Sequence, residues 1–370
     1  MKPELIETTG MMDDLLERLN DVTLIAVDTE FFRETTYYPQ LALVQIATDS
    51  IVACIDPLAF DAKDALRKLL LDNSITKIFH SCSQDLEVLF YYLGEAPAAI
   101  YDTQIANALL TEHHQIGYAS LVEKELGTLL DKSQTRTNWL QRPLTEKQLQ
   151  YAGDDVLYLY RLQHLLDEKL QQLGRKNWFD EESAKLLDGN DNFQLAQENL
   201  WRRVKGTTRL NRKQLAIVQA IATWRETLAQ KRDRTRRRIL ADEIMISLAV
   251  TPPEDIDSID SFIERRYRLD NEEKRQLFDV ITTSRQTPRE QCPDNQFNSL
   301  DNEQKSTLKK LQQIVNKKAE ELGISPAMLG SRKELEQLIL SHSKAAVTGL
   351  SLMQGWRLRC IGQQLIDNMK

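Results

Sequence analysis

Cysteine is scarce in this sequence. Its 370 residues include only Cys54, Cys82, Cys292 and Cys360, and no two of them form a C-x-x-C pair. That scarcity argues against a disulfide framework and a cysteine zinc site, and it predicts a reducing, cytoplasmic setting. Long apolar runs are missing too, because no stretch approaches the ~18 residues that a membrane helix needs. The acidic, mixed N-terminus is not typical of a secretory signal. We therefore expect a cytoplasmic protein without a membrane partner.

Several common catalytic signatures are also absent. The sequence contains no G-x-x-x-x-G-K-[ST], no G-x-G-x-x-G and no G-x-S-x-G. This leaves no sign of an ATP-driven motor, a dinucleotide-binding fold or an acyl-transfer nucleophile. The adjacent pair His113-His114 is expected in a loop, and adjacent residues on a helix would not face one metal ion.

The charge is distributed unevenly. The net charge of −7 alone argues against nucleic-acid binding. However, the 40 residues from Trp201 to Leu240 hold 13 Lys or Arg and only two acids, Glu226 and Asp233. One basic segment in an otherwise acidic chain indicates a module that binds a polyanion.

The first 175 residues or so alternate between strand-like and helix-like patterns. Strands are expected at 22–31, 41–48, 51–55 and 75–80, and helices at 61–71, 84–93, 103–111, 118–126 and 145–173. The last helix opens with T-E-K-Q, a capping box. Hairpin strands followed mainly by helices predict a mixed α/β layer fold.

Beyond Gly174 the pattern becomes helical. Nearly all of 193–370 is amphipathic, apart from 284–302, which is rich in Pro, Asn, Gln and Ser and is typical of a linker. The segments that begin at Leu215 and Leu308 resemble each other loosely, which suggests a duplication. We therefore predict an α/β domain followed by two small all-α domains.

An apolar strand that ends in two acids raises a chemical question. In L-I-A-V-D-T-E-F-F at 24–32, Asp28 and Glu30 are two residues apart and point to the same side of a strand. Like charges held close together resist ionisation. A basic partner, protonation or a metal ion must compensate, and the strand alone leaves all three open.

More acids are placed where they could join this pair. Asp85 opens a helix after a short strand, and Tyr151 and Asp155 share one face of a long helix. Four carboxylates suit two Mg²⁺ or Mn²⁺ ions, which would activate a water and stabilise a departing oxygen. A nearby tyrosine hydroxyl could orient or deprotonate that water. The alternative is that these acids end a strand, cap a helix and face solvent.

Three motifs in order resemble those of the ribonuclease D family. The first is D-T-E-F at 28–31 with T-Y-Y-P-Q-L at 36–41, and the second is H-S-C-S-Q-D-L-E-V-L at 80–89. The third is D-K-S-Q-T-R-T-N-W-L-Q-R-P-L-T at 131–145, running into Y-A-G-D-D-V at 151–156. This family belongs to the DEDD superfamily of 3′–5′ exonucleases, in the subgroup whose last motif is Tyr-x-x-x-Asp.

The resemblance implies a fold, a reaction and a set of site residues. The fold would be ribonuclease-H-like, at residues 1–175, and the reaction would hydrolyse the 3′-terminal phosphodiester and release 5′-nucleotides. The ligands of two divalent metal ions, Mg²⁺ or Mn²⁺, would be Asp28, Glu30, Asp85 and Asp155, and Tyr151 would hold the attacking water. Phe31 could pack against the terminal nucleotide, or be a core aromatic. His80 and Gln84 could reach the terminal sugar, or support the second motif.

The basic segment has a resemblance of its own. A-Q-K-R-D-R-T-R-R-R-I-L-A-D-E at 229–243 is similar to the HRDC domain of ribonuclease D and of RecQ-type helicases, and G-W-R-L-R-C-I-G at 355–362 looks like the end of a second copy. HRDC-like domains are expected at 205–285 and 300–370. Phosphate contacts are predicted for Arg232, Arg234, Arg236, Arg237 and Arg238. The alternative is a solvated face, and the second copy lacks such a run.

Taken together, these features predict a metal-dependent 3′–5′ exoribonuclease. Its substrate would be structured RNA with a single-stranded 3′ end, tRNA precursors above all, and it would act as a monomer. A DNA exonuclease of proofreading or helicase-associated type would share every catalytic residue and differ only in the pocket that senses the 2′-OH. A non-catalytic nucleic-acid-binding scaffold is the other alternative, and the presence of all five site residues argues against it.

Overall fold

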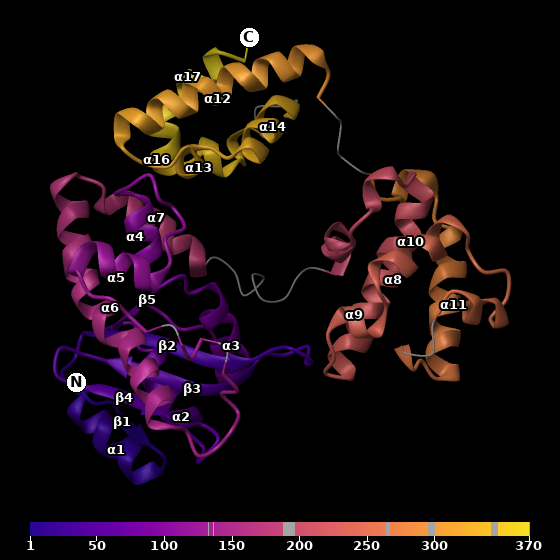
Figure 1. Ribbon diagram of the computed structural model, residues 1–370. Coiled ribbons are helices and arrows are strands. Elements are labelled where there is room, and N and C mark those ends of the chain that lie inside the picture. Colours follow the sequence, from indigo (N-terminus) through magenta and orange to yellow (C-terminus); the bar gives the residue numbers. More distant parts are fainter. Residues whose placement is uncertain are drawn as a thin grey trace. The chain divides into compact units, whose positions relative to one another are not determined.

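The computed structural model describes residues 1–131, 133–135, 137–187, 197–263, 267–294, 300–341 and 347–369. The chain forms two compact units, each with a hydrophobic core (Figure 1). The first unit comprises residues 1–32, 41–188 and 300–370, and the second comprises 33–40 and 189–299. Each unit is therefore assembled from segments that are distant in the sequence.

A six-stranded mixed sheet lies at the centre of the first unit. The strands are β1 (Glu4–Ile6), β2 (Leu24–Phe32), β3 (Gln40–Ala47), β4 (Val52–Ile55), β5 (Thr76–Phe79) and β6 (Ile100–Asp102), in the order β1-β4-β3-β2-β5-β6. β3 and β4 are antiparallel, whereas β2, β5 and β6 are parallel neighbours. The carboxyl ends of these three parallel strands therefore meet at one edge of the sheet.

Seven helices accompany the sheet among the described residues before Asp188. They are α1 (Thr9–Arg18), α2 (Lys63–Leu70), α3 (Ser83–Leu93), α4 (Thr103–Ala108), α5 (Tyr118–Leu126), α6 (Glu146–Gln172) and α7 (Lys176–Leu187). The long helix α6 packs against β2, β4 and β5. It begins with the predicted capping box, in which the Gln148 amide donates to Thr145 Oγ1 over 3.2 Å and the Thr145 amide donates to Gln148 Oε1 over 3.0 Å.

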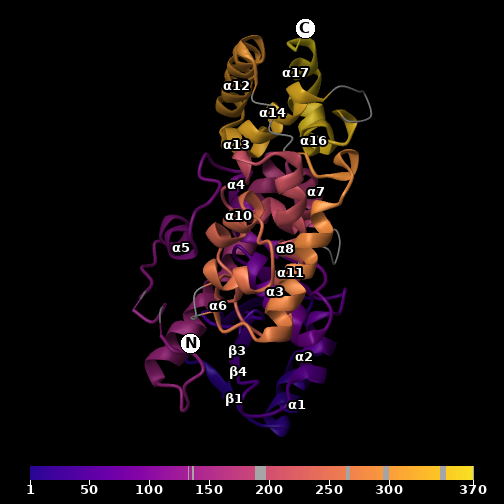
Figure 2. The same ribbon diagram turned by 90° about the vertical axis from the view of Figure 1, so that its right-hand side faces the viewer.

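The C-terminal helices share the core of the first unit. They are α12 (Asn302–Leu322), α13 (Pro326–Leu329), α14 (Arg332–Leu340), α16 (Gly355–Arg357) and α17 (Gln363–Asp367), with a 3₁₀ turn at Ser351–Met353 and a π turn at Leu358–Gly362. They lie beside α4 and α7 (Figures 1 and 2). Trp178 of α7 stacks on Trp356 at 4.5 Å, and the Arg175 guanidinium donates to both Leu109 O and Leu322 O over 2.6 Å.

Two glutamates of α7 bind the segment 355–359, which we call the C-terminal clasp. The Glu182 carboxylate accepts hydrogen bonds from Trp356 Nε1 (2.7 Å) and from the Arg357 guanidinium (2.8 and 3.1 Å). The Glu181 carboxylate accepts from the Trp356 amide over 2.6 Å. Gly355 has φ +54°, and a Cβ there would come within 1.9 Å of Glu181 Oε2, so the approach requires glycine.

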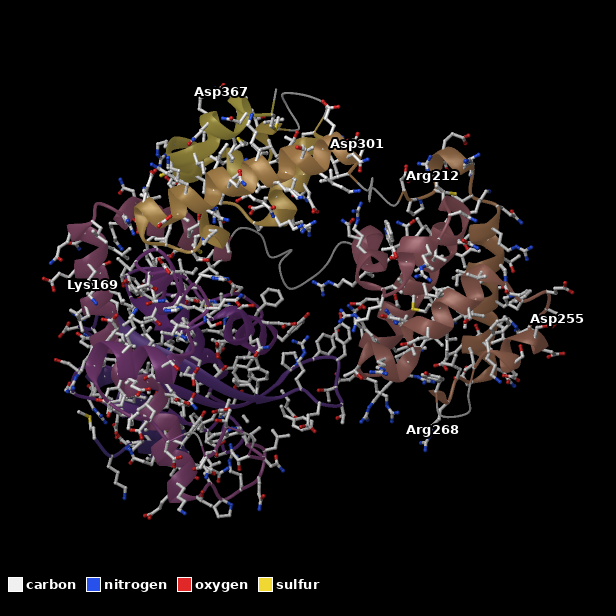
Figure 3. All side chains as sticks on the ribbon, turned by 45° about the horizontal axis from the view of Figure 1, so that its top comes forward. Lys169, Arg212, Asp255, Arg268, Asp301 and Asp367 are labelled. Atoms are coloured by element: carbon white, nitrogen blue, oxygen red, sulfur yellow. The ribbon has the colours of Figure 1, made fainter. Side chains whose placement is uncertain are left out.

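The second unit is helical. Its α-helices are α8 (Arg212–Lys231), α9 (Arg236–Ile239), α10 (Asp242–Val250) and α11 (Asn271–Arg285), with 3₁₀ turns at Gln197–Arg203, Thr207–Arg209, Asp257–Ser261 and Arg289–Gln291. Helices α8, α9 and α10 contain 20, four and nine residues, and α12, α13 and α14 contain 21, four and nine. Both series begin with a capping box, at Asn211 and at Asp301, and Figure 3 labels Asp301. This correspondence supports the duplication suggested by the sequence.

The segment 33–40, which continues β2 and leads into β3, belongs to the second unit. The Tyr37 side chain is buried, its hydroxyl donates to the Glu226 carboxylate, and the Arg236 guanidinium lies 5.0 Å from its ring. The amides of Tyr37 and Tyr38 both donate to Asp233 Oδ1 over 3.0 Å. Part of the segment 229–243, which we call the arginine-rich stretch, thus binds the residues that follow the strand of Asp28.

The predicted elements are present, with shifted ends, and four further elements were not predicted. The predicted helix 103–111 ends at Ala108, and the elements without a prediction are β1, α1, β6 and α7. β1 and β6 have three residues each, too few for a periodic pattern to be read. In the part of the chain that the structure describes, no helix has the length and hydropathy to span a bilayer.

Candidate active site

Three carboxylates gather where β2 meets α6. β2 presents Asp28 and Glu30, and α6 presents Asp155. One oxygen from each lies within 4.8 Å of the other two, and all three side chains keep some solvent exposure. We call these residues the carboxylate cluster. No other such group of three possible metal ligands occurs among the described residues.

Asp85 lies next to the carboxylate cluster. It occupies the first turn of α3, it is buried, and its Oδ1 accepts a hydrogen bond of 2.5 Å from the Thr29 hydroxyl. Its negative charge raises the pKa of both Asp28 and Glu30. The structure therefore brings together all four acids that the sequence analysis selected.

The electrostatics of the site show how costly this arrangement is. Burial, followed by neighbouring carboxylates, raises the pKa of Asp28 well above its usual range and that of Glu30 to about 9. Burial raises the pKa values of Asp85 and Asp155 to about 7. Among the described residues, the interactions that lower these pKa values come from hydroxyl and backbone hydrogen bonds, and none comes from Lys or Arg.

The sequence left open whether a basic partner, protonation or a metal ion compensates the charges of Asp28 and Glu30. Among the described residues, no Lys or Arg compensates these charges, and within that part of the chain protons or a cation remain. The donor set consists of carboxylate oxygens, the ligands that hard divalent cations prefer, and it is partly open to solvent. The residues present therefore fit the divalent metal that the resemblance implies.

Tyr151 is positioned as a hydrogen-bond donor. A hydrogen bond from its hydroxyl lowers the pKa of Asp155, and the same hydroxyl lies 3.4 Å from Thr135 Oγ1. Burial and the charges of Asp155 and Glu30 raise the pKa of Tyr151. The phenol of Tyr151 therefore stays protonated. A protonated phenol is suited to orient a water and poorly suited to take a proton from that water.

Two further residues near the carboxylate cluster, Tyr118 and Thr29, were not predicted from the sequence. The Tyr118 hydroxyl donates to the backbone carbonyl of Asp154 over 2.9 Å. Burial is the largest cause that raises the pKa of Tyr118, and the charges of Asp155 and Asp28 raise it further. Thr29 was also missed, although its position between two acids was a possible signal. The Asp154 side chain, by contrast, accepts a hydrogen bond from Gln150 and is no part of the carboxylate cluster.

Three residues were given alternative roles toward a substrate, and the structure places each of them. His80 has both ring nitrogens occupied, by Thr103 Oγ1 at 2.9 Å and by Ile116 O at 3.0 Å, which favours the supporting role. Gln84 is exposed on the first turn of α3, and Phe31 is partly exposed on β2 beside Glu30. Their substrate contacts remain predictions.

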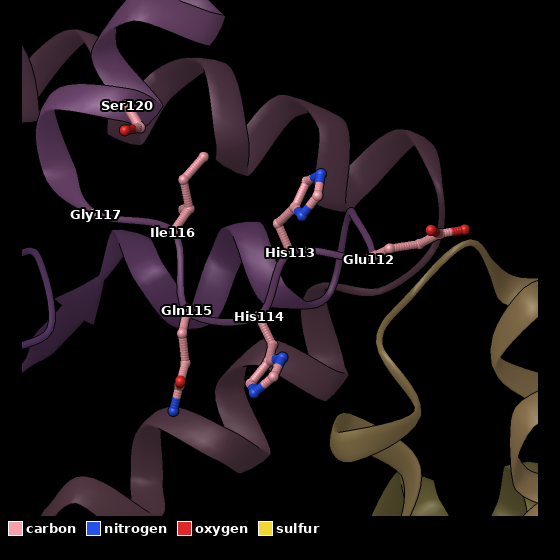
Figure 4. A pocket seen from close by; sticks show the side chains of 7 residues that line it. All are labelled: Glu112, His113, His114, Gln115, Ile116, Gly117 and Ser120. Atoms are coloured by element: carbon pink, nitrogen blue, oxygen red, sulfur yellow. The ribbon is translucent and has the colours of Figure 1, made fainter.

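The loop held by His80 lines an open pocket of about 490 Å³ (Figure 4). Its lining residues are Glu112, His113, His114, Gln115, Ile116, Gly117 and Ser120. His113 and His114 point to opposite sides of the loop (Figure 4). The pair was predicted to lie in a loop, and the structure places it in one.

The five arginines predicted to contact RNA differ in their surroundings. Arg232 pairs with Glu273 at 2.5 Å and donates to the carbonyl of Arg268 (labelled in Figure 3). Arg236 pairs with Glu226. The remaining three, Arg234, Arg237 and Arg238, form no such ion pair within the described part of the chain, and all three are exposed. These three are the better candidates for phosphate contact.

Without divalent cations, the protein is expected to lose stability as pH rises from about 4 to about 9. Glu30, Asp85 and Asp155 have folded-state pKa values above their unfolded ones, so the folded state binds protons more tightly. The resulting stabilisation is lost as pH rises through about 7 for Asp85 and Asp155 and through about 9 for Glu30. Melting temperatures in EDTA across this range, with saturating Mg²⁺ as the control, test this. A melting temperature that rises with pH in EDTA would contradict it.

Comparisons with known proteins show which families this chain resembles. A 3′–5′ exonuclease family matches residues 3–171, the HRDC domain matches 214–262, and the C-terminal HRDC domain of ribonuclease D matches 303–365. Ribonuclease D of Desulfotalea psychrophila is 35% identical over 364 residues, covering 96% of each chain. Ribonuclease D of Escherichia coli is 32% identical over 374 residues, covering 99% of this chain and 98% of that protein.

The fold comparison leads to the same family. The crystal structure of Escherichia coli RNase D, described as an exoribonuclease involved in structured RNA processing, matches with a TM-score of 0.87 and 30% identity, covering 100% of this chain and 99% of that one. The predicted fold class, a ribonuclease-H-like exonuclease domain followed by helical HRDC domains, is confirmed. The chain belongs to the ribonuclease D family of 3′–5′ exoribonucleases.

Proposed function

We propose that this protein trims structured RNA from its single-stranded 3′ end, with tRNA precursors as the principal substrates. It acts in the cytoplasm as a monomer and releases 5′-mononucleotides. The observation that carries this proposal is the carboxylate cluster, which has no cationic side chain to neutralise it among the described residues and lies within the matched exonuclease region. The RNA preference rests on membership of the family.

Two divalent ions, Mg²⁺ or Mn²⁺, are the proposed cofactors. Asp28, Glu30, Asp85 and Asp155 would hold them. When bound, such ions activate a water and stabilise the oxygen that leaves in an in-line displacement. Thr29 fixes Asp85 through its hydroxyl, and the Tyr151 hydroxyl, which donates to Asp155, can accept a hydrogen bond from the attacking water and hold it in line.

The proposed RNA-binding surface is the part of the arginine-rich stretch at Arg234, Arg237 and Arg238. Arg237→Gln combined with Arg238→Gln is expected to weaken RNA binding and to flatten its salt dependence, by about 0.7 to 0.9 in slope for each phosphate group that is no longer bound. Filter-binding titrations at several salt concentrations measure this. Arg236 is left intact because of its ion pair with Glu226.

Arg275→Gln provides a matched control in the same unit. Arg275 is an exposed arginine of α11 with a surface ion pair to Glu272, so its replacement should change the slope little. An equal slope for the double variant and the wild type would leave the arginine-rich stretch as a solvated face.

A gel assay on a tRNA with a short extra 3′ tail tests the function. The matching DNA oligonucleotide is run alongside, and both are incubated in Mg²⁺, in Mn²⁺ and in EDTA. Stepwise shortening of the RNA alone, lost in EDTA, is the expected result. Faster shortening of the DNA would favour a DNA exonuclease, and tight binding without shortening of either would favour a non-catalytic scaffold.

A further inference from the structure

A buried carboxylate outside the cluster joins the beginnings of two helices. Asp102 is the last residue of β6 and is 2% exposed. Its Oδ1 accepts hydrogen bonds from the amides of Ser81 (3.1 Å) and Gln104 (2.7 Å), and its Oδ2 accepts from the amide of Cys82 over 2.9 Å. One side chain therefore binds the turn that leads into α3 and caps α4.

The position of Asp102 follows from the sheet register. β5 and β6 are parallel, with Phe79 opposite Asp102, so Asp102 lies beside the point where the chain leaves β5. The chain there passes through Ser81, which has φ +61° although it is not a glycine. Such a conformation is strained and persists only where surrounding contacts impose it. The hydrogen bonds from Asp102 are contacts of this kind.

Helix α3 depends on this external acceptor. Its own N-cap residue, Cys82, provides no side-chain hydrogen bond to the helix. Asp102 satisfies the Cys82 amide from the neighbouring strand instead. Three residues later comes Asp85, whose Oδ1 is bound by Thr29. Asp85 is thus held from two sides, by Thr29 at its carboxylate and by Asp102 at the start of its helix.

We infer that Asp102 is a positioning residue that orients the Asp85 carboxylate for cation binding. This inference rests on the metal-binding role of Asp85 proposed above. Capping α4 alone would be a local structural role, and it uses only Oδ1. The hydrogen bond from Cys82 to Oδ2 belongs to the positioning role. The two roles can therefore be separated by substitution.

Asp102→Asn replaces one of the two accepting oxygens with an NH₂ group that cannot accept. Asp102→Ser keeps a side chain suited to cap α4 but is too short to reach the turn at Ser81 and Cys82 as well. Each variant is expected to bind Mn²⁺ roughly tenfold or more weakly than the wild type, the usual effect of losing a residue that orients a metal ligand. Electron paramagnetic resonance titration of the free protein with Mn²⁺, without RNA, gives the affinity.

Asp301→Ala is the matched control. Asp301 is the N-cap of α12, where it accepts from the Gln304 amide over 2.8 Å. This variant should lose cap stability, seen as a lower melting temperature, while binding Mn²⁺ as the wild type does. A general loss of stability would weaken Mn²⁺ binding in all three variants alike and would overturn the positioning role.

The outcomes distinguish this inference from the proposed function. Wild-type affinity in either folded Asp102 variant overturns the inference while the proposed function stands. Absence of Mn²⁺ binding in the wild type overturns the proposed function and the inference with it. If Asp102→Asn does not fold, Asp102→Ser decides, because it retains the cap of α4.

Discussion

The Asp28→Asn variant is expected to lose RNA hydrolysis by roughly a thousandfold or more, about 4 kcal/mol of transition-state stabilisation. The substitution keeps the shape of the side chain and removes a charge from the carboxylate cluster, so the site holds cations poorly. RNA binding should persist, because the arginine-rich stretch is remote in sequence from β2. Single-turnover hydrolysis and filter binding on the same preparation measure the two properties.

The same variant is expected to melt at a higher temperature than the wild type in EDTA. Burial and the charges of Asp85, Asp155 and Glu30 all oppose ionisation of Asp28, and a neutral isostere relieves both effects. Asp154→Asn is the control, since this neighbour lies outside the cluster and should keep near-normal activity. Retained hydrolysis in Asp28→Asn, or loss of binding together with hydrolysis, would contradict the proposed division of roles.

The second large effect is expected in the free energy of unfolding, from Glu182→Ala, which removes a partner of the C-terminal clasp. Its carboxylate accepts from Trp356 Nε1 and twice from Arg357, and both charged side chains are only 10% exposed. Removing one partner of a buried pair leaves the other charge uncompensated, at a cost of about 3 kcal/mol. Urea denaturation followed by tryptophan fluorescence is a direct measurement, because Trp178 and Trp356 stack at this place.

Glu336→Ala gives the comparison for an exposed pair. Glu336 pairs with Arg332 across one turn of α14, and these side chains are 35% and 71% exposed. Such surface pairs contribute about 0–1 kcal/mol, so the denaturation midpoint should shift little. Equal shifts for Glu182→Ala and Glu336→Ala would show that the clasp contributes no more than a surface ion pair.

Local signals in the sequence predicted much of the fold and of the candidate site. The alternation that ends in Asp28 and Glu30 belongs to one strand, and the Tyr151–Asp155 spacing belongs to one helix. The capping box at Thr145 likewise involves residues three apart. Each of these patterns depends on neighbours along the chain, and for that reason it can be read without coordinates.

Features that depend on distant partners could not be read in this way. Tyr37 and Asp233 are 196 residues apart, and nothing in T-Y-Y-P indicates that this segment packs with α8 and α9. Similarly, the arginine-rich stretch did not reveal that Arg236 pairs with Glu226. Asp102 had a local signal as the N-cap of α4, but its bonds to Ser81 and Cys82 depend on the pairing of β5 with β6.

The C-terminal clasp has a consequence for synthesis on the ribosome. The first unit combines residues 1–32 and 41–188 with 300–370, so the intervening 189–299 must be translated before the unit can be completed. At ordinary elongation rates that interval lasts roughly ten seconds. Until then Trp178, Glu181 and Glu182 of α7 lack the partners that cover them. A chain interrupted before Gly355 would therefore display an uncovered tryptophan and two acids without the hydrogen bonds that Trp356 and Arg357 donate. Chaperones and proteases can recognise such exposed groups in an incomplete chain.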